Sequence, residues 1–300
     1  EVRAAASGEL AKARPDLHKL VLTLASSKDY QAGMAAVDKN FELLDEQPDL
    51  VDAHFLAGYA ELETGNAAEA VRRFGRTLAL NPRYPLASYE LGLALEATGD
   101  VAGAIAAYEA ATALDPRHGE ALVHRADLLA ASGRVTEAVA LYRDAVALSP
   151  ASAVLRAKFG ALLLRTRDLA AAERELREAV RLLPTVPVAH FNLGLLAEQA
   201  GREDEAAAEY RLAQAADADD IRPLVNLAAL HRKRGERREE AELLARAVAL
   251  EPGFAPGYEM LARARAALGD APGAREARLA GARAAARDEQ APGRPPRGTR

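Results

Sequence analysis

Apolar residues recur along most of the chain at helical spacing, in blocks that are separated by Gly and Pro. Leu91 and Leu95 are four positions apart before Gly99, and Ile105 and Tyr108 are three apart after it. Spacings of three and four place apolar side chains on one face of an α-helix. The pattern therefore predicts pairs of amphipathic helices, with a glycine between the two members of each pair.

These pairs recur at a constant spacing from position 51 onward, and such a fixed period is the signature of a repeat architecture. Small residues in the first helix recur at Gly58, Gly92, Ala126, Gly160, Gly194, Ala228 and Ala262. Turn residues recur at Gly65, Gly99, Gly133, Arg167, Gly201, Gly235 and Gly269. The second helix carries Ala70, Ala104, Ala138, Ala172, Ala206, Glu240 and Ala274, followed by Phe74, Tyr108, Tyr142, Leu176, Tyr210, Leu244 and Arg278. The repeats close at Pro82, Pro116, Pro150, Pro184, Ala218, Pro252 and Ala286.

Each of these positions has a mechanical role. Glycine enters the left-handed conformation that ends the first helix at little cost. The next residue is often a good N-cap for the second helix, as at Asn66, Asp100, Asp168 and Asp270. The closing proline cannot continue a helix and marks the turn into the next repeat. The paired small residues let the two helices pack closely, and the Phe or Tyr fills the space beside them.

Period and pattern resemble the tetratricopeptide repeat, whose unit has about 34 residues. Residues 88–116 are similar to a complete consensus copy. The resemblance implies an all-α fold, an α-solenoid that winds as a right-handed superhelix of stacked antiparallel helix hairpins. It covers seven repeats of equal length, at 51–84, 85–118, 119–152, 153–186, 187–220, 221–254 and 255–288.

Several positions depart from the family pattern. Arg167 replaces the turn glycine of repeat four, and Glu240 replaces the small alanine of repeat six. We expect both hairpins to be less regular than the others. At the fourth position, where the family has an aromatic residue, the seven repeats have His54, Ser88, Leu122, Arg156, His190, Leu224 and Tyr258. His54 and His190 are interpreted as substitutes for that aromatic side chain.

The two ends of the chain differ from its middle. Residues 1–16 are expected to form a linker or a helix remnant, and residues 17–50 a divergent hairpin of the same kind. Repeat seven places Arg278 and Gly281 at normally apolar positions, which is typical of a solvating terminal repeat. Residues 289–300 have too little apolar content to fold and are expected to be a disordered tail. As an alternative to a plain tail, its Arg-Pro-Pro-Arg segment could serve as a polyproline ligand.

The chain lacks the motifs of the common enzyme classes. It has no Cys, and therefore no thiolate nucleophile and no Cys-ligated metal. There is no phosphate-binding loop, dinucleotide fingerprint, His-Glu-x-x-His pattern or nucleophile elbow. Asp217, Asp219 and Asp220 lack the glycine that a calcium loop needs at its bend, so a solvated turn is the preferred interpretation. We expect a protein that is not an enzyme and that carries no cofactor and no metal.

Charge and hydropathy limit the partners. The net charge of −5 with 28% charged residues gives no basic field for nucleic acid. No stretch approaches the roughly 20 apolar residues of a membrane span. Apolar residues make up 50% of the chain but aromatic ones only 5%, which fits close helix packing through alanine. The absence of Cys leaves the compartment open; a cytoplasmic location is slightly favoured, and an exported or membrane-associated longer chain stays an alternative.

The resemblance implies that positions two, five, six, nine, twelve and thirteen of each repeat face a concave groove. In this chain, positions five, six and nine combine aromatic, aliphatic and polar side chains, which suit an extended peptide or an amphipathic helix. The candidate groove residues are Phe55, Tyr59, Tyr89, Leu93, His124, Asp127, Lys158, Phe191, Asn192, Leu195 and Asn226. Packing of Tyr59 and Tyr89 against a neighbouring helix is an equally weighted alternative.

Two sub-types of the family have recognisable residues at the groove positions. No repeat has the Lys at position five and Asn at position nine of the chaperone-tail clamp. Asn192 and Asn226 are two rungs of the asparagine ladder that glycosyltransferase-type repeats carry at position six. Repeat five is strongly acidic, whereas repeats four and six are basic. These charge blocks either attract a partner of patterned charge or pair across adjacent hairpins.

The function predicted from the sequence is a non-enzymatic scaffold that binds another protein through its groove. The alternative is the repeat segment of a larger enzyme, such as a sulfatase or glycosyltransferase, whose catalytic domain lies outside this chain. The protein is expected to be a monomer, with self-assembly through an open first hairpin as a further alternative. Repeat proteins of this kind bind their partners along extended surfaces.

Overall fold

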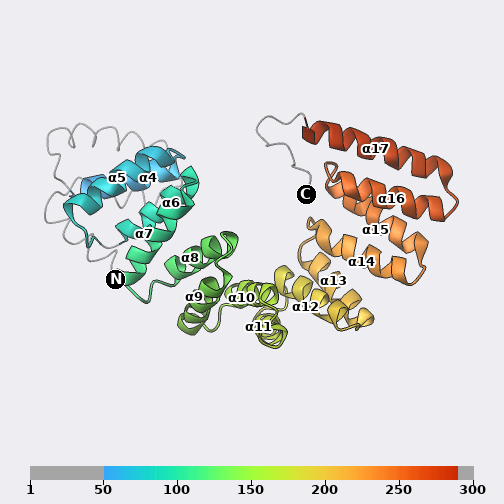
Figure 1. The fold of residues 1–300 in the computed structure, drawn as a ribbon, viewed down its shortest axis with the longest axis horizontal. Helices are drawn as coiled ribbons and strands as arrows, with labels where there is room; N and C mark the ends of the chain where they lie inside the picture. The colour runs from blue at the N-terminus through green and yellow to red at the C-terminus, as the bar shows by residue number, and fades with distance from the viewer. Residues whose placement is uncertain (1–50, 85, 290–300) are drawn as a thin grey trace. The chain divides into compact units, whose positions relative to one another are not determined.

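A computed structural model describes residues 51–84 and 86–289; for residues 288 and 289 it describes the backbone alone. The expectations for residues 1–16 and 17–50, and for the tail beyond residue 289, lie outside the described residues. Within the described residues the secondary structure consists of fourteen α-helices, α4 to α17, without a strand. Figure 1 shows these helices following one another as antiparallel pairs. The fold is an all-α solenoid of helix hairpins.

The chain divides into two compact parts at the junction of Ser149 and Pro150, here called the N-terminal and C-terminal halves. The described part of the N-terminal half holds three helix pairs, which coincide with repeats one to three. Their bounds are α4 Val51–Glu63, α5 Ala67–Leu80, α6 Ala87–Thr98, α7 Val101–Leu114, α8 Gly119–Ala131 and α9 Val135–Leu148.

The C-terminal half holds four helix pairs in its described part, at the places of repeats four to seven. Their bounds are α10 Ala153–Arg165, α11 Leu169–Leu182, α12 Pro187–Gln199, α13 Glu203–Ala216, α14 Ile221–Lys233, α15 Arg237–Leu250, α16 Ala255–Ala267 and α17 Ala271–Glu289. The last helix has 19 residues, whereas α15 has 14. In each half, every helix packs against the helix that follows it.

The hairpins are held together by a large side chain of the second helix that lies over a small residue of the first. Tyr210 is fully buried, and a Cβ atom built on Gly194 would lie only 2.5 Å from its ring. Phe74 has the same relationship to Gly58 in repeat one. In these two repeats the missing Cβ atom leaves the space that the ring fills, and this confirms the packing role that the sequence indicates.

Arg167 adopts the same left-handed backbone conformation as the turn glycines, with a φ of 61° against 73° at Gly201. Helices α10 and α11 have 13 and 14 residues, the same lengths as α12 and α13. The expectation of a less regular hairpin in repeat four is therefore wrong. The packing of the two helices fixes the turn, and the arginine accepts a conformation that is costly for a residue with a Cβ atom.

Glu240 is buried within repeat six, where the other repeats have alanine. Its carboxylate accepts a hydrogen bond of 2.8 Å from Nη1 of Arg237, one turn earlier in α15. Helices α14 and α15 keep the ordinary lengths of 13 and 14 residues, so the expected irregularity is absent here too. The pairing with Arg237 compensates the buried charge, since unpaired buried carboxylates are strongly unfavourable.

Three of the four predicted N-caps are confirmed and one is wrong. The carboxylates of Asp100, Asp168 and Asp270 accept hydrogen bonds from the backbone N–H groups of the first turn that follows each. Asn66 precedes α5, but its side chain makes no capping hydrogen bond. Its amide instead donates to the carboxylate of Glu61 at 2.8 Å. A stronger, charged acceptor at the end of α4 thus takes the side chain away from the helix N-terminus.

Candidate functional site

The predicted groove residues all lie on the first helices of their repeats, namely α4, α6, α8, α10, α12 and α14. None is fully buried. Lys158 is exposed, and the other ten are half-buried. The large side chains of the second helices, such as Phe74 and Tyr210, are by contrast completely covered.

In repeat one, Phe55 and Tyr59 belong to one apolar cluster with Phe74 at its centre. The ring centroid of Phe55 lies 5.7 Å from that of Phe74 and 4.9 Å from that of Tyr84. Tyr84 in turn donates a hydrogen bond of 2.7 Å to Asp52. Phe55 and Tyr59 therefore contribute to hairpin packing while keeping part of their surface accessible to solvent.

Tyr89 is the centre of an aromatic cluster between repeats two and three. Its ring centroid lies 5.8 Å from that of Tyr108, 4.5 Å from that of His118 and 5.9 Å from that of His124. Leu93 packs on the same cluster. The structure thus brings Tyr89, Leu93 and His124 together, and it places Phe55 and Tyr59 in a different cluster.

Glu96, at position twelve of repeat two, is a central polar residue that is absent from the groove residues predicted from the sequence. Its carboxylate accepts a hydrogen bond from the hydroxyl of Tyr108 and lies 3.1 Å from Nδ1 of His124. Burial, together with the bond to Glu96, raises the pKa of Tyr108. The family resemblance places position twelve in the groove, so Glu96 could have been predicted as a groove residue from the sequence.

Asp127, at position nine of repeat three, has a comparable role. Its carboxylate accepts a hydrogen bond from the hydroxyl of Tyr142 on the second helix of the same repeat. Burial and this hydrogen bond raise the pKa of Tyr142. One oxygen of the predicted groove residue Asp127 is therefore used to hold its own hairpin together.

The C-terminal half has an aromatic cluster around Phe191. The ring centroids of Phe191 and Tyr210 are 5.8 Å apart, and Leu195 packs on the same cluster. The guanidinium carbon of Arg222 lies 4.9 Å from the centroid of the Phe191 ring, in a cation–π contact. Arg222 also forms a salt bridge of 2.7 Å with Asp220.

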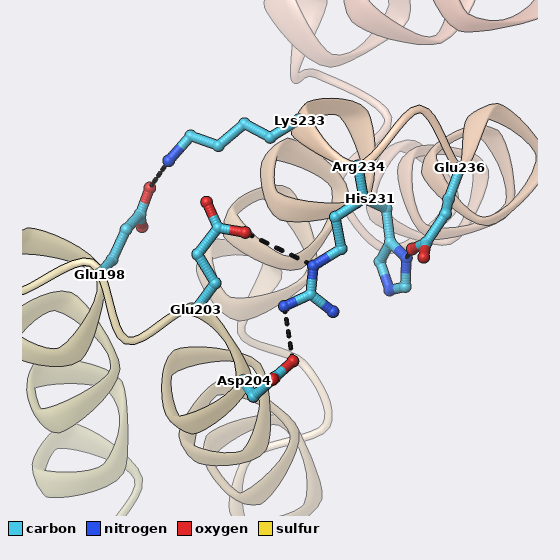
Figure 2. Close-up of polar contacts among 7 residues, drawn as sticks. All are labelled: Glu198, Glu203, Asp204, His231, Lys233, Arg234 and Glu236. Carbon is cyan, nitrogen blue, oxygen red and sulfur yellow. Dashed lines mark hydrogen bonds and ion pairs between the residues drawn. The ribbon is translucent and has the colours of Figure 1, made fainter.

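Glu198 connects this cluster to the next repeat. Its carboxylate accepts hydrogen bonds of 3.0 Å from the hydroxyl of Tyr210 and 3.0 Å from Nζ of Lys233. Figure 2 shows Lys233 extending from α14 towards Glu198. Burial is the main cause that raises the pKa of Tyr210, the bond to Glu198 adds to it, and a hydrogen bond with Asn226 opposes it.

The asparagine pair makes contacts within the protein. The amide of Asn192 donates to the carbonyl oxygen of Val188 in its own helix at 2.7 Å, and Asn226 bonds to Tyr210. Both side chains stay half-buried. The two rungs therefore have different partners in the structure, in contrast to the uniform environment that a ladder implies.

The acidic and basic blocks pair across adjacent hairpins of the C-terminal half. Arg234 contacts Asp204 at 2.8 Å and Glu203 at 3.5 Å, as seen in Figure 2. Arg177 and Arg202 add contacts between repeats four and five, at 3.9 Å to Glu205 and 3.6 Å to Glu173. Of the two interpretations of the charge blocks, pairing between hairpins accounts for these residues.

The histidines at position four are buried in the hairpins, as expected of aromatic substitutes. His190 also has polar partners. Its Nδ1 lies 2.7 Å from Oε2 of Glu209, and its Nε2 lies 2.8 Å from the carbonyl oxygen of Pro184. Arg156 makes the same two contacts one repeat earlier, with Glu175 at 2.5 Å and the carbonyl oxygen of Pro150 at 2.8 Å.

The acidic cluster between repeats five and six has a structural role. Asp217 accepts a hydrogen bond from the N–H of Asp219, and Asp220 caps α14 and pairs with Arg222. Within residues 51–84 and 86–289, no group of three or more His, Asp or Glu side chains is arranged to hold a metal ion. In the same part of the chain, no helix is both long and apolar enough to cross a membrane.

Stacked helix hairpins of constant length, with a small residue under a large one and a left-handed turn, define a tetratricopeptide-repeat protein. A match to a sequence model of one family identifies the particular family within this class. The model described as the Cilia and flagella-associated protein 70 C-terminal domain, of the tetratricopeptide-repeat type, matches residues 5–294. The chain belongs to this family. No curated protein matches the chain.

Solved structures share the fold. A tetratricopeptide repeat protein from Parabacteroides merdae superimposes with a TM-score of 0.63 at 16% identity, covering 79% of this chain and 92% of that one. PilF of Pseudomonas aeruginosa superimposes with a TM-score of 0.59 at 21% sequence identity, and the match covers 71% of this chain and 97% of PilF. The APC/C hetero-tetramer Cut9–Hcn1 gives 0.57 at 17% identity over 93% of this chain, which spans 55% of that chain's length. At these identities the likeness concerns the fold.

Proposed function

We propose that this chain is a non-enzymatic scaffold that binds a segment of another protein along the first helices of its repeats. The observation that carries the proposal is that aromatic and polar side chains of the first helices keep part of their surface accessible to solvent. The candidate groove residues on the first helices are half-buried or exposed, whereas the large residues opposite them, such as Tyr108 and Tyr210, are completely buried. Solenoid proteins typically use the extended surface of such stacked helices for binding.

The composition of this surface favours an extended peptide or an amphipathic helix as the bound segment. Phe55, Tyr59, Tyr89 and Phe191 offer apolar ring surface. Side chains with hydrogen-bonding groups, such as Asn192, lie on the same helices. Peptide recognition generally combines apolar pockets for alternate side chains with polar groups that satisfy the peptide backbone.

The proposal is tested by replacing two rings of the first helices. Tyr59→Ala and Tyr89→Ala, separately and together, should abolish co-purification of the partner protein from the source cells. A matched control is Tyr258→Ala, a half-buried tyrosine of the terminal repeat, which should leave the partner bound. Circular dichroism at 222 nm must stay unchanged, because a loss of helix would reduce binding indirectly. Unchanged capture by the double variant would contradict the proposal.

A further inference from the structure

The clusters around Tyr89 and Phe191 occupy equivalent positions, three repeats apart. The ring pairs Tyr89–Tyr108 and Phe191–Tyr210 both have centroid distances of 5.8 Å, with interplanar angles of 47° and 43°. In both clusters the hydroxyl of the buried tyrosine donates to a carboxylate at position twelve. The two clusters are therefore one local architecture that occurs twice in the chain, with Glu96 in one half corresponding to Glu198 in the other.

The Phe191 cluster holds two cations of the chain itself. The guanidinium of Arg222 stands over the Phe191 ring at 4.9 Å. The ammonium group of Lys233 contacts Glu198 at 3.0 Å. The ring face and the carboxylate are thus each paired with a positive charge from repeat six.

The Tyr89 cluster keeps the ring and the carboxylate but has other residues in place of both cations. Glu120 stands at the position that corresponds to Arg222, and Ala131 at the position that corresponds to Lys233. Within residues 51–84 and 86–149, neither Glu96 nor Glu120 is paired with a lysine or arginine; Glu96 contacts His124. Glu120 thus replaces the cation Arg222 by an anion, whose carboxylate is hydrogen-bonded to the Tyr89 side chain. The imidazole of His118 lies beside the Tyr89 ring, with 4.5 Å between the centroids.

The electrostatic environment of Tyr89 agrees with this surplus of negative charge. Burial raises the pKa of Tyr89 to about 12, and the carboxylates of Glu120, Glu90 and Glu96 add to the effect. Repeat two as a whole carries five acidic residues against Arg117, a net charge of −4. A half-buried aromatic ring surrounded by carboxylates attracts a cation through both its face and its neighbours.

We propose that the Tyr89 cluster binds an arginine or lysine side chain of the partner segment, in the place that Arg222 and Lys233 fill in the Phe191 cluster. The cationic group would lie against the part of the half-buried Tyr89 ring that His118 leaves accessible, and it would pair with Glu96 and Glu120. Arginine fits best, because its guanidinium both stacks on aromatic rings and forms two hydrogen bonds with a carboxylate. This inference rests on the proposed scaffold function and adds the chemistry of the bound residue.

The test uses a fluorescein-labelled peptide, acetyl-Gly-Leu-Arg-Gly-Leu-Arg-Gly-amide, and a second peptide with citrulline in place of both arginines. Citrulline has nearly the same shape as arginine but no charge. Fluorescence anisotropy with the full chain should give a dissociation constant at least about tenfold lower for the arginine peptide. Glu120→Gln should reduce that difference, and Glu120→Arg, which copies the Phe191 cluster, should abolish it.

Two variants of the other cluster serve as matched controls. Glu198→Gln should leave the affinity of the arginine peptide unchanged, because Lys233 already contacts that carboxylate. The double variant Arg222→Glu with Lys233→Ala removes both cations and should create a second binding site, which changes the stoichiometry from one peptide per chain to two. Circular dichroism confirms that each variant is folded.

Equal binding of the citrulline and arginine peptides, or an unchanged affinity in Glu120→Arg, would overturn the inference. So would the absence of binding by either peptide to the wild-type chain. Failure of the scaffold proposal is recognised separately, because Tyr59 lies outside the Tyr89 cluster. If Tyr59→Ala still abolishes partner capture while the peptides show no preference for charge, the scaffold proposal stands and the cation site does not.

Discussion

The imidazole of His190 lies buried beside the carboxylate of Glu209, with 2.7 Å between Nδ1 and Oε2. The other ring nitrogen contacts the carbonyl oxygen of Pro184 at 2.8 Å. Both acceptors require an N–H donor, and only the protonated imidazole has an N–H on each nitrogen. The hydrogen bond to Glu209 accordingly raises the pKa of His190 above its usual value, against the opposing effect of burial, and the Pro184 carbonyl adds to the increase.

The stability of the C-terminal half should therefore fall as the pH rises. A histidine with a raised pKa in the folded state stabilises fully below its unfolded pKa of about 6.5, and this contribution is lost as the pH rises through the folded value. Urea unfolding at several pH values from about 6 to about 9 should show the decline. His190→Arg copies Arg156, which makes the same two contacts, and should remove this part of the pH dependence. An identical pH profile in the variant would contradict the assignment.

Gly194→Ala should destabilise the chain by about 2 kcal/mol, because the added methyl group must displace a buried ring in a packed interior. The new Cβ atom would lie 2.5 Å from Cε1 of Tyr210. Gly253→Ala is the control, since its Cβ atom would have no atom within 4 Å, and it should change stability by less than about 0.5 kcal/mol. Chemical denaturation measures both values. Similar stabilities of the two variants would show that the helices can separate without cost.

Arg167→Gly should stabilise the C-terminal half by about 1 kcal/mol, because a residue with a Cβ atom is strained in the left-handed region. The φ of Arg167 is 61°, and its side chain is exposed, so the substitution removes little else. The reverse change at the equivalent turn, Gly201→Ala, should destabilise by a similar amount. A stabilising Gly201→Ala would be inconsistent with the strain argument, and thermal unfolding of both variants provides the measurement.

The helical hairpins could be predicted from the sequence because each one is specified locally. The apolar period, the turn glycine and the small residue opposite a large one all lie within a single repeat. Arg167 and Glu240 show the limit of this approach: both break the local pattern, yet the helices keep their lengths. Packing of neighbouring helices fixes the Arg167 turn, and Arg237 compensates Glu240.

The contacts of the candidate site were less accessible to sequence analysis. Positions five, six and nine led to Tyr89, His124 and Phe191, which do lie in clusters between successive repeats. The pairing of Glu198 with Lys233 was missed, because it joins residues that are 35 positions apart and depends on how one hairpin rests on the next. The residue type at one position of a repeat does not indicate which residue of the next repeat it contacts.

The binding face proposed for this scaffold can be tested most directly by site-specific photo-cross-linking. A photoreactive amino acid would replace either Lys158, which is exposed on the first helix of repeat four, or Arg211, which is exposed on the second helix of repeat five. Partner proteins would then be identified by mass spectrometry of the covalent adducts. The proposal predicts adducts with a partner from position 158 and none from position 211. Adducts from position 211 alone would contradict binding along the first helices.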